Sequence, residues 1–150
     1  MKKFLSALCL VALCAAAALA QARPEGRESA PDDSGEGIPV LVMHLPDWEK
    51  KVGEEYAYAT SLPALQKAAG NQPALDAFDF DSSVEAVTAK YEAGRLVIVE
   101  FPTPQHSVEA DAAIRRRVEE LKAAGQPAPS LYSRIGNYSV FVFDAPDFAA

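Results

Sequence analysis

The stretch Val84–Phe101 constrains the fold most, because it combines a hairpin pattern with a continuous apolar run. Apolar and polar residues alternate up to Tyr91, the break Glu92–Arg95 contains a glycine, and the next four residues are all apolar. This pattern predicts two antiparallel strands, Val84–Tyr91 and Leu96–Phe101. Since the second strand is apolar on both faces, we expect it in the middle of a sheet that is covered on each side.

Residues 1–22 have the composition of a secretory signal peptide. Lys2 and Lys3 are followed by an uncharged run that ends in small residues, with acceptable cleavage sites after Ala20 and Ala22. The alternative is a retained membrane anchor, for which the uncharged run is at the lower limit of length. We therefore expect export to the periplasm or the extracellular space.

Cleavage would remove both cysteines, Cys9 and Cys14, together with two lysines and no acid. The mature chain would then lack disulfides and thiol chemistry, and its net charge would change from −7 to near −9. An acidic surface argues against nucleic acid and anionic lipid as partners. Contact with a membrane is expected only if an anchor follows Ala150.

Residues 23–37 are rich in proline, glycine, serine and acid and contain no large apolar residue, so we expect a disordered acidic linker. Residues 38–150 then form a single domain. Its first apolar run, Ile38–Met43, could be an edge strand, because Pro39 cannot donate to a ladder. Trp48 is expected in a turn at the rim of the core.

Two helices are predicted from their end signals. In the shorter one Ser61 is the N-cap, Pro63 lies in the first turn and Gly70 follows the end. The longer one is expected from Ser107, as N-cap, to about Ala124, and its apolar residues repeat with helical spacing.

A further strand is predicted at Tyr138–Phe143. Gly136-Asn137 before it is either a two-residue hairpin turn or a bulge. Asp144–Asp147 has the pattern of a helix start close to Ala150, which suggests a C-terminal truncation. The predicted fold class is α+β, with an antiparallel sheet and a long amphipathic helix packed on one face.

Catalytic candidates are limited to His106, Glu100 and His44, and none of them belongs to a catalytic motif. The histidines lack zinc-type spacing, so no metal site and no cofactor site is predicted. We expect Glu100, as the one charge of the central strand, to find a partner at the strand end, with Arg134 as the candidate. The functional alternative places Glu100, His106 and the Thr103–Gln105 loop around one cleft.

Three segments carry a resemblance to a known family: Leu45–Trp48, Val97–Gln105 and Arg134–Phe143. They resemble an uncharacterised domain family of exported acidobacterial proteins, a family of unknown function. The resemblance runs from about Leu45 to the end of the chain. It implies an exported α+β domain, often with further sequence after residue 147, and it implies no catalytic residues.

These observations favour an exported, non-enzymatic α+β module that binds a small ligand or an envelope protein. One alternative is a cofactor-free envelope hydrolase with a histidine general base. Another is a membrane-linked envelope protein whose anchor is missing from this chain.

Overall fold

The structure is a computed structural model that describes residues 37–51, 56–81 and 83–146. The predicted signal peptide and all but the last residue of the predicted linker lie outside these residues. The described part is an α+β fold built on a five-stranded antiparallel sheet with strand order β1-β2-β3-β5-β4. The strands are β1 (Tyr56–Ala59), β2 (Glu85–Tyr91), β3 (Gly94–Glu100), β4 (Leu131–Ile135) and β5 (Tyr138–Phe143).

The predicted hairpin is confirmed as β2 and β3, which pair antiparallel from Glu85↔Glu100 to Tyr91↔Gly94. Its turn is shorter than expected, because only Glu92 and Ala93 lie between the strands. β3 takes the predicted central position, between β2 and β5. β1, which was not predicted from the sequence, adds an edge strand beside β2.

The other predicted strand, β5, is also confirmed and pairs with both β3 and β4. Gly136 and Asn137 form a two-residue hairpin turn between β4 and β5, so the bulge alternative is wrong. After β5, Asp144 has a positive φ of 52° and no helix begins at residues 144–146. Asp147, the last residue of the predicted helix start, lies outside the described residues.

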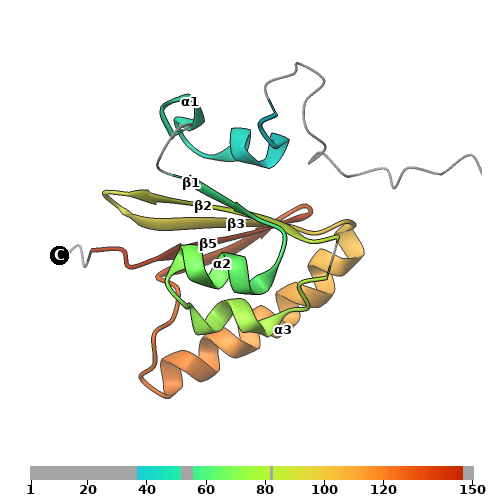
Figure 1. The fold of residues 1–150 in the computed structure, drawn as a ribbon. Helices are drawn as coiled ribbons and strands as arrows, with labels where there is room; N and C mark the ends of the chain where they lie inside the picture. The colour runs from blue at the N-terminus through green and yellow to red at the C-terminus, as the bar shows by residue number, and fades with distance from the viewer. Residues whose placement is uncertain (1–36, 52–55, 82, 147–150) are drawn as a thin grey trace, which may run out of the picture.

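Helices lie along one face of the sheet (Figure 1). These are α2 (Leu62–Ala69), the 3-10 helix η2 (Pro73–Ala77) and α3 (Pro104–Ala123). The ends of α2 are those predicted, with Ser61 as N-cap and Gly70 in the left-handed conformation at φ 87°. The expected start of α3 is wrong, because Thr103 is the N-cap and its side chain accepts a hydrogen bond from the His106 N–H.

The opposite face is partly covered by the N-terminal segment of the described chain (Figure 1). This segment contains the 3-10 helix η1 (Val40–His44) and the short helix α1 (Trp48–Lys51). The expectation of an edge strand at Ile38–Met43 is therefore wrong. Leu41 and Val42 are both fully buried, which a strand could not achieve on a single face because neighbouring side chains alternate.

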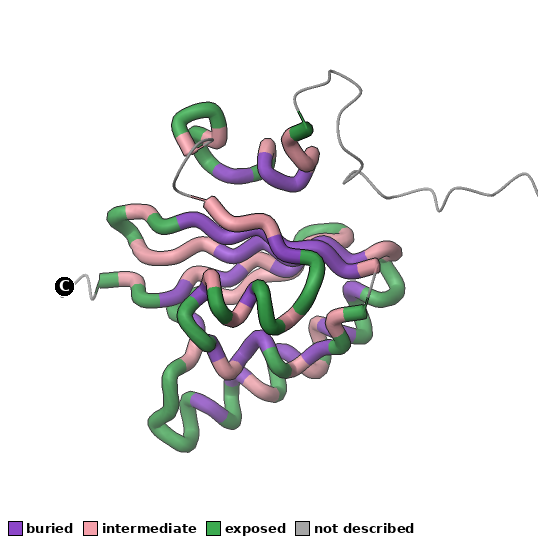
Figure 2. Tube along the Cα trace, viewed as in Figure 1, coloured by how far each residue is buried: buried purple, intermediate pink, exposed green. Residues whose placement is uncertain are grey.

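Among the described residues the core consists of two clusters, one on each face of the sheet, and the buried residues follow the central strands (Figure 2). The larger cluster joins Val97, Val99, Phe141 and Phe143 of the sheet to helix residues such as Ile114. The smaller cluster joins residues of η1 to the other face of β2 and β3.

Candidate functional site

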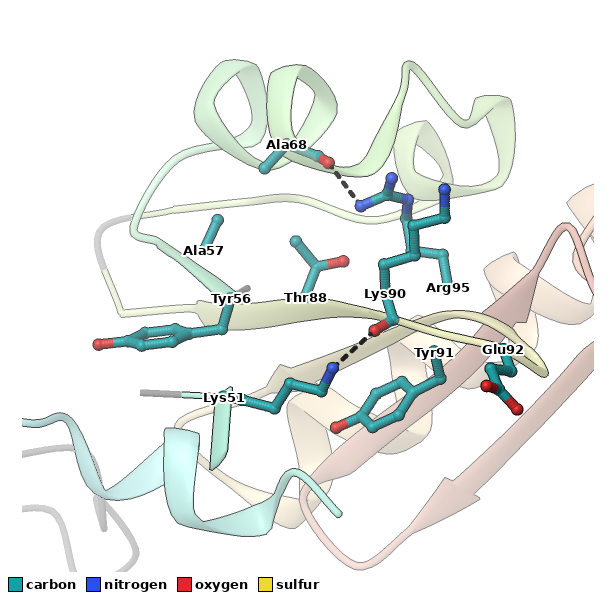
Figure 3. A pocket seen from close by; sticks show the side chains of 9 residues that line it. All are labelled: Lys51, Tyr56, Ala57, Ala68, Thr88, Lys90, Tyr91, Glu92 and Arg95. Carbon is teal, nitrogen blue, oxygen red and sulfur yellow. Dashed lines mark hydrogen bonds between the residues drawn. The ribbon is translucent and has the colours of Figure 1, made fainter. Parts of the chain in front are cut away.

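A groove lies where β2 extends beyond β1 (Figure 3). β1 begins at Tyr56, opposite Ala89, whereas β2 continues to Tyr91 before the turn. The groove has a volume of about 640 Å³. It is lined by Lys51, Tyr56, Ala57, Ala68, Thr88, Lys90, Tyr91, Glu92 and Arg95.

Two cations of the groove, Lys90 and Arg95, stand directly opposite each other on β2 and β3. Like charges in this arrangement destabilise a sheet. Part of this cost is offset by the C-terminal turn of α2, where the Arg95 guanidinium donates to the Ala68 carbonyl at 3.0 Å. The partial negative charge at a helix C-terminus favours cations. A guanidinium has five N–H donors, and among the described residues the bond to Ala68 is the one hydrogen bond that the Arg95 side chain makes.

The third cation, Lys51, comes from α1 and covers the exposed edge of β2. Its ammonium donates to the Lys90 carbonyl at 3.1 Å and lies 4.8 Å from the centre of the Tyr91 ring. The Tyr91 hydroxyl donates to the Pro46 carbonyl at 2.9 Å, which fixes the ring under the lysine. Tyr56, opposite Ala89, places a second aromatic ring on the same face of the sheet as Tyr91 (Figure 3).

The groove therefore combines positive charge with aromatic surface on a chain whose net charge is −7. Among the described residues that line the groove, Glu92 is the one acid, and none is a histidine or a cysteine. The Thr88 hydroxyl already donates to the Leu96 carbonyl at 2.9 Å. The residues present can hold an anion against a ring, but they do not form a nucleophile with an adjacent base.

His106, a predicted candidate, lines a second groove of about 360 Å³ beside the start of α3. Asp79, Asp81 and Glu109 also line it, but Glu100 does not, so the proposed cleft of Glu100 and His106 is not formed. Hydrogen bonds from the Ser83 side chain and main chain lower the pKa of Asp81, and the charge of His106 adds to this effect. Among the described residues that line this groove, none is a serine, threonine or cysteine that could act as a nucleophile.

Glu100 and His44, the other two candidates, lie on the opposite face of the sheet and meet at Tyr138. Glu100 pairs across the strands with Tyr138 on one side and with Glu85 on the other. His44 Nε2 lies 3.4 Å from the Tyr138 hydroxyl, with 5.1 Å between ring centres. Glu85 and Glu100 are only 8% and 4% exposed, and neither lines the two grooves described above.

The expected ion pair of Glu100 with Arg134 is wrong. Arg134 pairs with Ser139, the neighbour of Tyr138, so its side chain lies on the other face of the sheet. Its guanidinium instead donates to the Gly136 carbonyl at 3.1 Å.

A polar network that the sequence reasoning missed connects α3 to β4 and β5. The Tyr132 hydroxyl lies 2.8 Å from Asp111 Oδ1 and 3.2 Å from the Ser139 hydroxyl. Arg115 Nε lies 3.0 Å from both carboxylate oxygens of Asp111. Burial opposes the charge of Asp111, but the hydrogen bonds from Arg115 and Tyr132 outweigh it and lower the pKa of this carboxyl. Burial, together with the neighbouring Asp111, raises the pKa of Tyr132 to about 12.

We expect Tyr132→Phe to lower the free energy of unfolding by about 2 kcal/mol, because the buried Ser139 hydroxyl and Asp111 each lose a partner.

The raised pKa of Tyr132 stabilises the fold at pH values below the ordinary tyrosine value of 10.0, and this stabilisation is lost as the pH rises through about 12. The lowered pKa of Asp111 stabilises the fold above 3.8, and this stabilisation is lost as the pH falls through the lower folded value.

The measurement is ultraviolet absorbance of tyrosinate during an alkaline titration of the folded protein. The titration curve of the parent chain should contain one tyrosine ionisation near pH 12 that is absent from the curve of Tyr132→Phe. If the ionisation that disappears in the variant lies near pH 10 instead, the pKa of Tyr132 is not raised and the network is wrong.

Within the ranges that the structure describes, no three His, Cys, Asp or Glu side chains are grouped closely enough to hold a metal ion. None of the helices in the same ranges is long and apolar enough to cross a membrane. No family model, curated protein or solved structure matches this chain significantly.

Proposed function

We propose that this chain is an exported, non-enzymatic module that binds an anionic ligand with an aromatic or apolar part in the groove of Figure 3. The observation that carries the proposal is a groove around the edge of β2 on an otherwise acidic protein, lined by three cations and two tyrosines. Lys90 and Arg95 line it on the face toward α2, and Lys51 lines it on the other face together with the two tyrosine rings. An anion would meet two cations that already repel each other, so binding would remove a cost of the free state. The rings of Tyr56 and Tyr91, on the other face beside the same edge of β2, would take the apolar part.

Export is supported by the composition of residues 1–22 alone. In this proposal α3 is an amphipathic support for the sheet that carries the groove. Ile114, Val118 and Leu121, which are buried, would form its inner side.

Binding should be measured calorimetrically with four probes that share a phenyl ring and differ in charge: benzoate, phenyl phosphate, benzyl alcohol and benzylammonium. We expect the two anions to bind and the neutral and cationic probes to bind at least tenfold more weakly, since only the anions gain from the cations of the groove. Affinity should fall with added salt, because the site is open to solvent.

Lys90→Gln tests the site without removing a structural hydrogen bond, as the structure gives the Lys90 side chain none within the described residues. We expect this variant to weaken anion binding about tenfold at unchanged melting temperature. Lys67→Gln, which removes the same charge from an exposed position on α2 outside the groove, is the matched control. Equal affinities for benzoate and benzyl alcohol, or equal losses in both variants, would contradict the proposal.

A hydrolase with His106 as general base is a second candidate, favoured by the acidic groove that His106 shares with Asp79, Asp81 and Glu109. Turnover of any ester or glycoside that His106→Ala abolishes and His44→Ala retains would support it. If the chain is a non-enzymatic binding module, the parent chain, His106→Ala and His44→Ala should all show no turnover.

A further inference from the structure

β4 is the outer strand on the side of the sheet away from the groove, and it exposes two large apolar side chains. Leu131 is 52% exposed and Ile135 is 63% exposed. Both lie on the face opposite Tyr132 and Arg134, because side chains alternate along a strand. β4 contains no acid, although the chain as a whole is acidic.

The register shows which main-chain groups of β4 point outward. The Phe101 N–H donates to the Asn137 carbonyl at 3.0 Å, in line with the β3–β5 register. Hydrogen-bonded pairs alternate along an antiparallel ladder, so Ser139 and every second residue after it bond to β3. The remaining β5 residues bond to β4, where their partners are Leu131, Ser133 and Ile135.

The N–H and C=O groups of Tyr132 and Arg134 therefore point away from the sheet. Within residues 37–51, 56–81 and 83–146, no hydrogen bond to these four groups is found. An edge of this kind is a ready template for another strand.

We propose that β4 pairs antiparallel with β4 of a second copy of this chain, about a twofold axis at Ser133, so that two five-stranded sheets become one continuous sheet. In this register Tyr132 forms the hydrogen-bonded pair with Arg134 of the other copy, and the same pair occurs again across the axis. All four outward main-chain groups of each copy are then satisfied.

Pairing through the outward groups of Tyr132 and Arg134 allows three antiparallel registers, with the twofold axis at Tyr132, Ser133 or Arg134. The side chains favour the axis at Ser133. An axis at Arg134 would place two guanidinium groups opposite each other, which is unfavourable. An axis at Tyr132 would place Leu131 opposite Ser133 and Ile135 opposite Pro129, so the two exposed apolar side chains would not cover each other.

An axis at Ser133 places Leu131 opposite Ile135, so the exposed apolar side chains cover each other. It also places Arg134 beside the Tyr132 ring of the other copy, whose hydroxyl is bonded to Asp111. Four main-chain hydrogen bonds and two apolar pairs form a small interface, so we expect a dissociation constant on the order of micromolar.

The first test is disulfide formation in the full chain. Ser133 would face itself in a non-hydrogen-bonded pair, where Cα atoms are about 4.5 Å apart, within the range of a disulfide. Ser133→Cys should therefore form a covalent dimer under mild oxidation. Ser130→Cys, on the same segment but not opposite itself, should not exceed the background that the unsubstituted chain gives through Cys9 and Cys14.

The second test is sedimentation velocity with a charge pair designed for this register. Leu131→Lys and Ile135→Glu should each weaken self-association about tenfold or more, because each places a charge against an apolar side chain. A mixture of the two variants should restore the dimer, since the introduced lysine faces the introduced glutamate at one end and the native pair remains at the other. Val108→Lys, at a 47% exposed apolar residue of α3, should change nothing.

A sedimentation profile of the parent chain that stays monomeric up to millimolar concentration would overturn the proposal. So would a mixture of Leu131→Lys and Ile135→Glu that associates no better than either variant alone, or equal cross-linking at positions 133 and 130. Both variants change exposed side chains, and a melting curve for each confirms that the fold is retained.

Discussion

Replacing Phe141 with alanine should lower the free energy of unfolding by about 4 kcal/mol, because the change removes a large side chain from the centre of the larger core cluster. Phe141 is fully buried, stacks on Phe143 at 5.7 Å between ring centres and contacts the Tyr132 ring at 4.9 Å. It comes from β5, which lies between β3 and β4, so its neighbours cannot collapse into the space without moving strands.

Urea denaturation followed by circular dichroism measures this loss, and the dependence on urea should keep its slope, because the surface exposed on unfolding is nearly unchanged. Phe80→Ala is the matched control, since Phe80 is only partly buried at the edge of the same cluster. We expect it to cost about 1 kcal/mol. A similar loss for both variants would mean that the cluster is not packed around Phe141.

The elements that the sequence predicted correctly are those whose signals are local. The β2–β3 hairpin follows from alternation, a glycine and an apolar run, all within one stretch. The ends of α2 coincide with Ser61, Pro63 and Gly70, residue types whose preferences for helix ends are local, although the Ser61 side chain makes no capping hydrogen bond here. Neither prediction requires knowledge of what packs against the element.

The predictions that failed depended on competition between local signals or on distant contacts. Thr103 and Ser107 can both cap a helix, and Pro104, which suits the first helical position, decides for Thr103. Ser107 then lies inside α3 and is fully buried. At Ile38–Met43 the apolar run forms a 3-10 turn because Leu41 and Val42 both pack against the same face of β2 and β3.

The groove was missed because its residues come from α1, β1, α2 and the hairpin, which the sequence does not place together. The pairing of Lys90 with Arg95 could have been predicted from the sequence, because a two-residue turn at Glu92-Ala93 places these residues opposite each other. The longer break that we expected put Arg95 in the turn instead. The alternation of side chains along a strand also separates Glu100 from Arg134. Glu100 pairs with Tyr138 and Arg134 pairs with Ser139, and these two neighbours on β5 lie on opposite faces of the sheet.

Gly94→Ala should lower the free energy of unfolding by about 3 kcal/mol, because two costs coincide at the start of β3. Gly94 has a φ of 118°, a conformation that side chains disfavour. An added Cβ would lie 2.5 Å from the Phe143 carbonyl oxygen and 3.0 Å from the Ala145 nitrogen. Both contacts are with main chain, so no side-chain rotation relieves them.

Gly136→Ala separates the two costs, because Gly136 has a positive φ of 58° but open space around the position of a Cβ. It should lose only the conformational part, about 1 kcal/mol. The difference between the variants, measured by urea denaturation, therefore reports the close approach of the chain after β5 to the hairpin. Gly94 also directly precedes Arg95, so a main-chain shift there should weaken anion binding in the groove, whereas Gly136→Ala should leave it unchanged. If the two alanine variants are equally stable, Gly94 does not lie against the end of β5, and the register of β3 with β5 is wrong at that end.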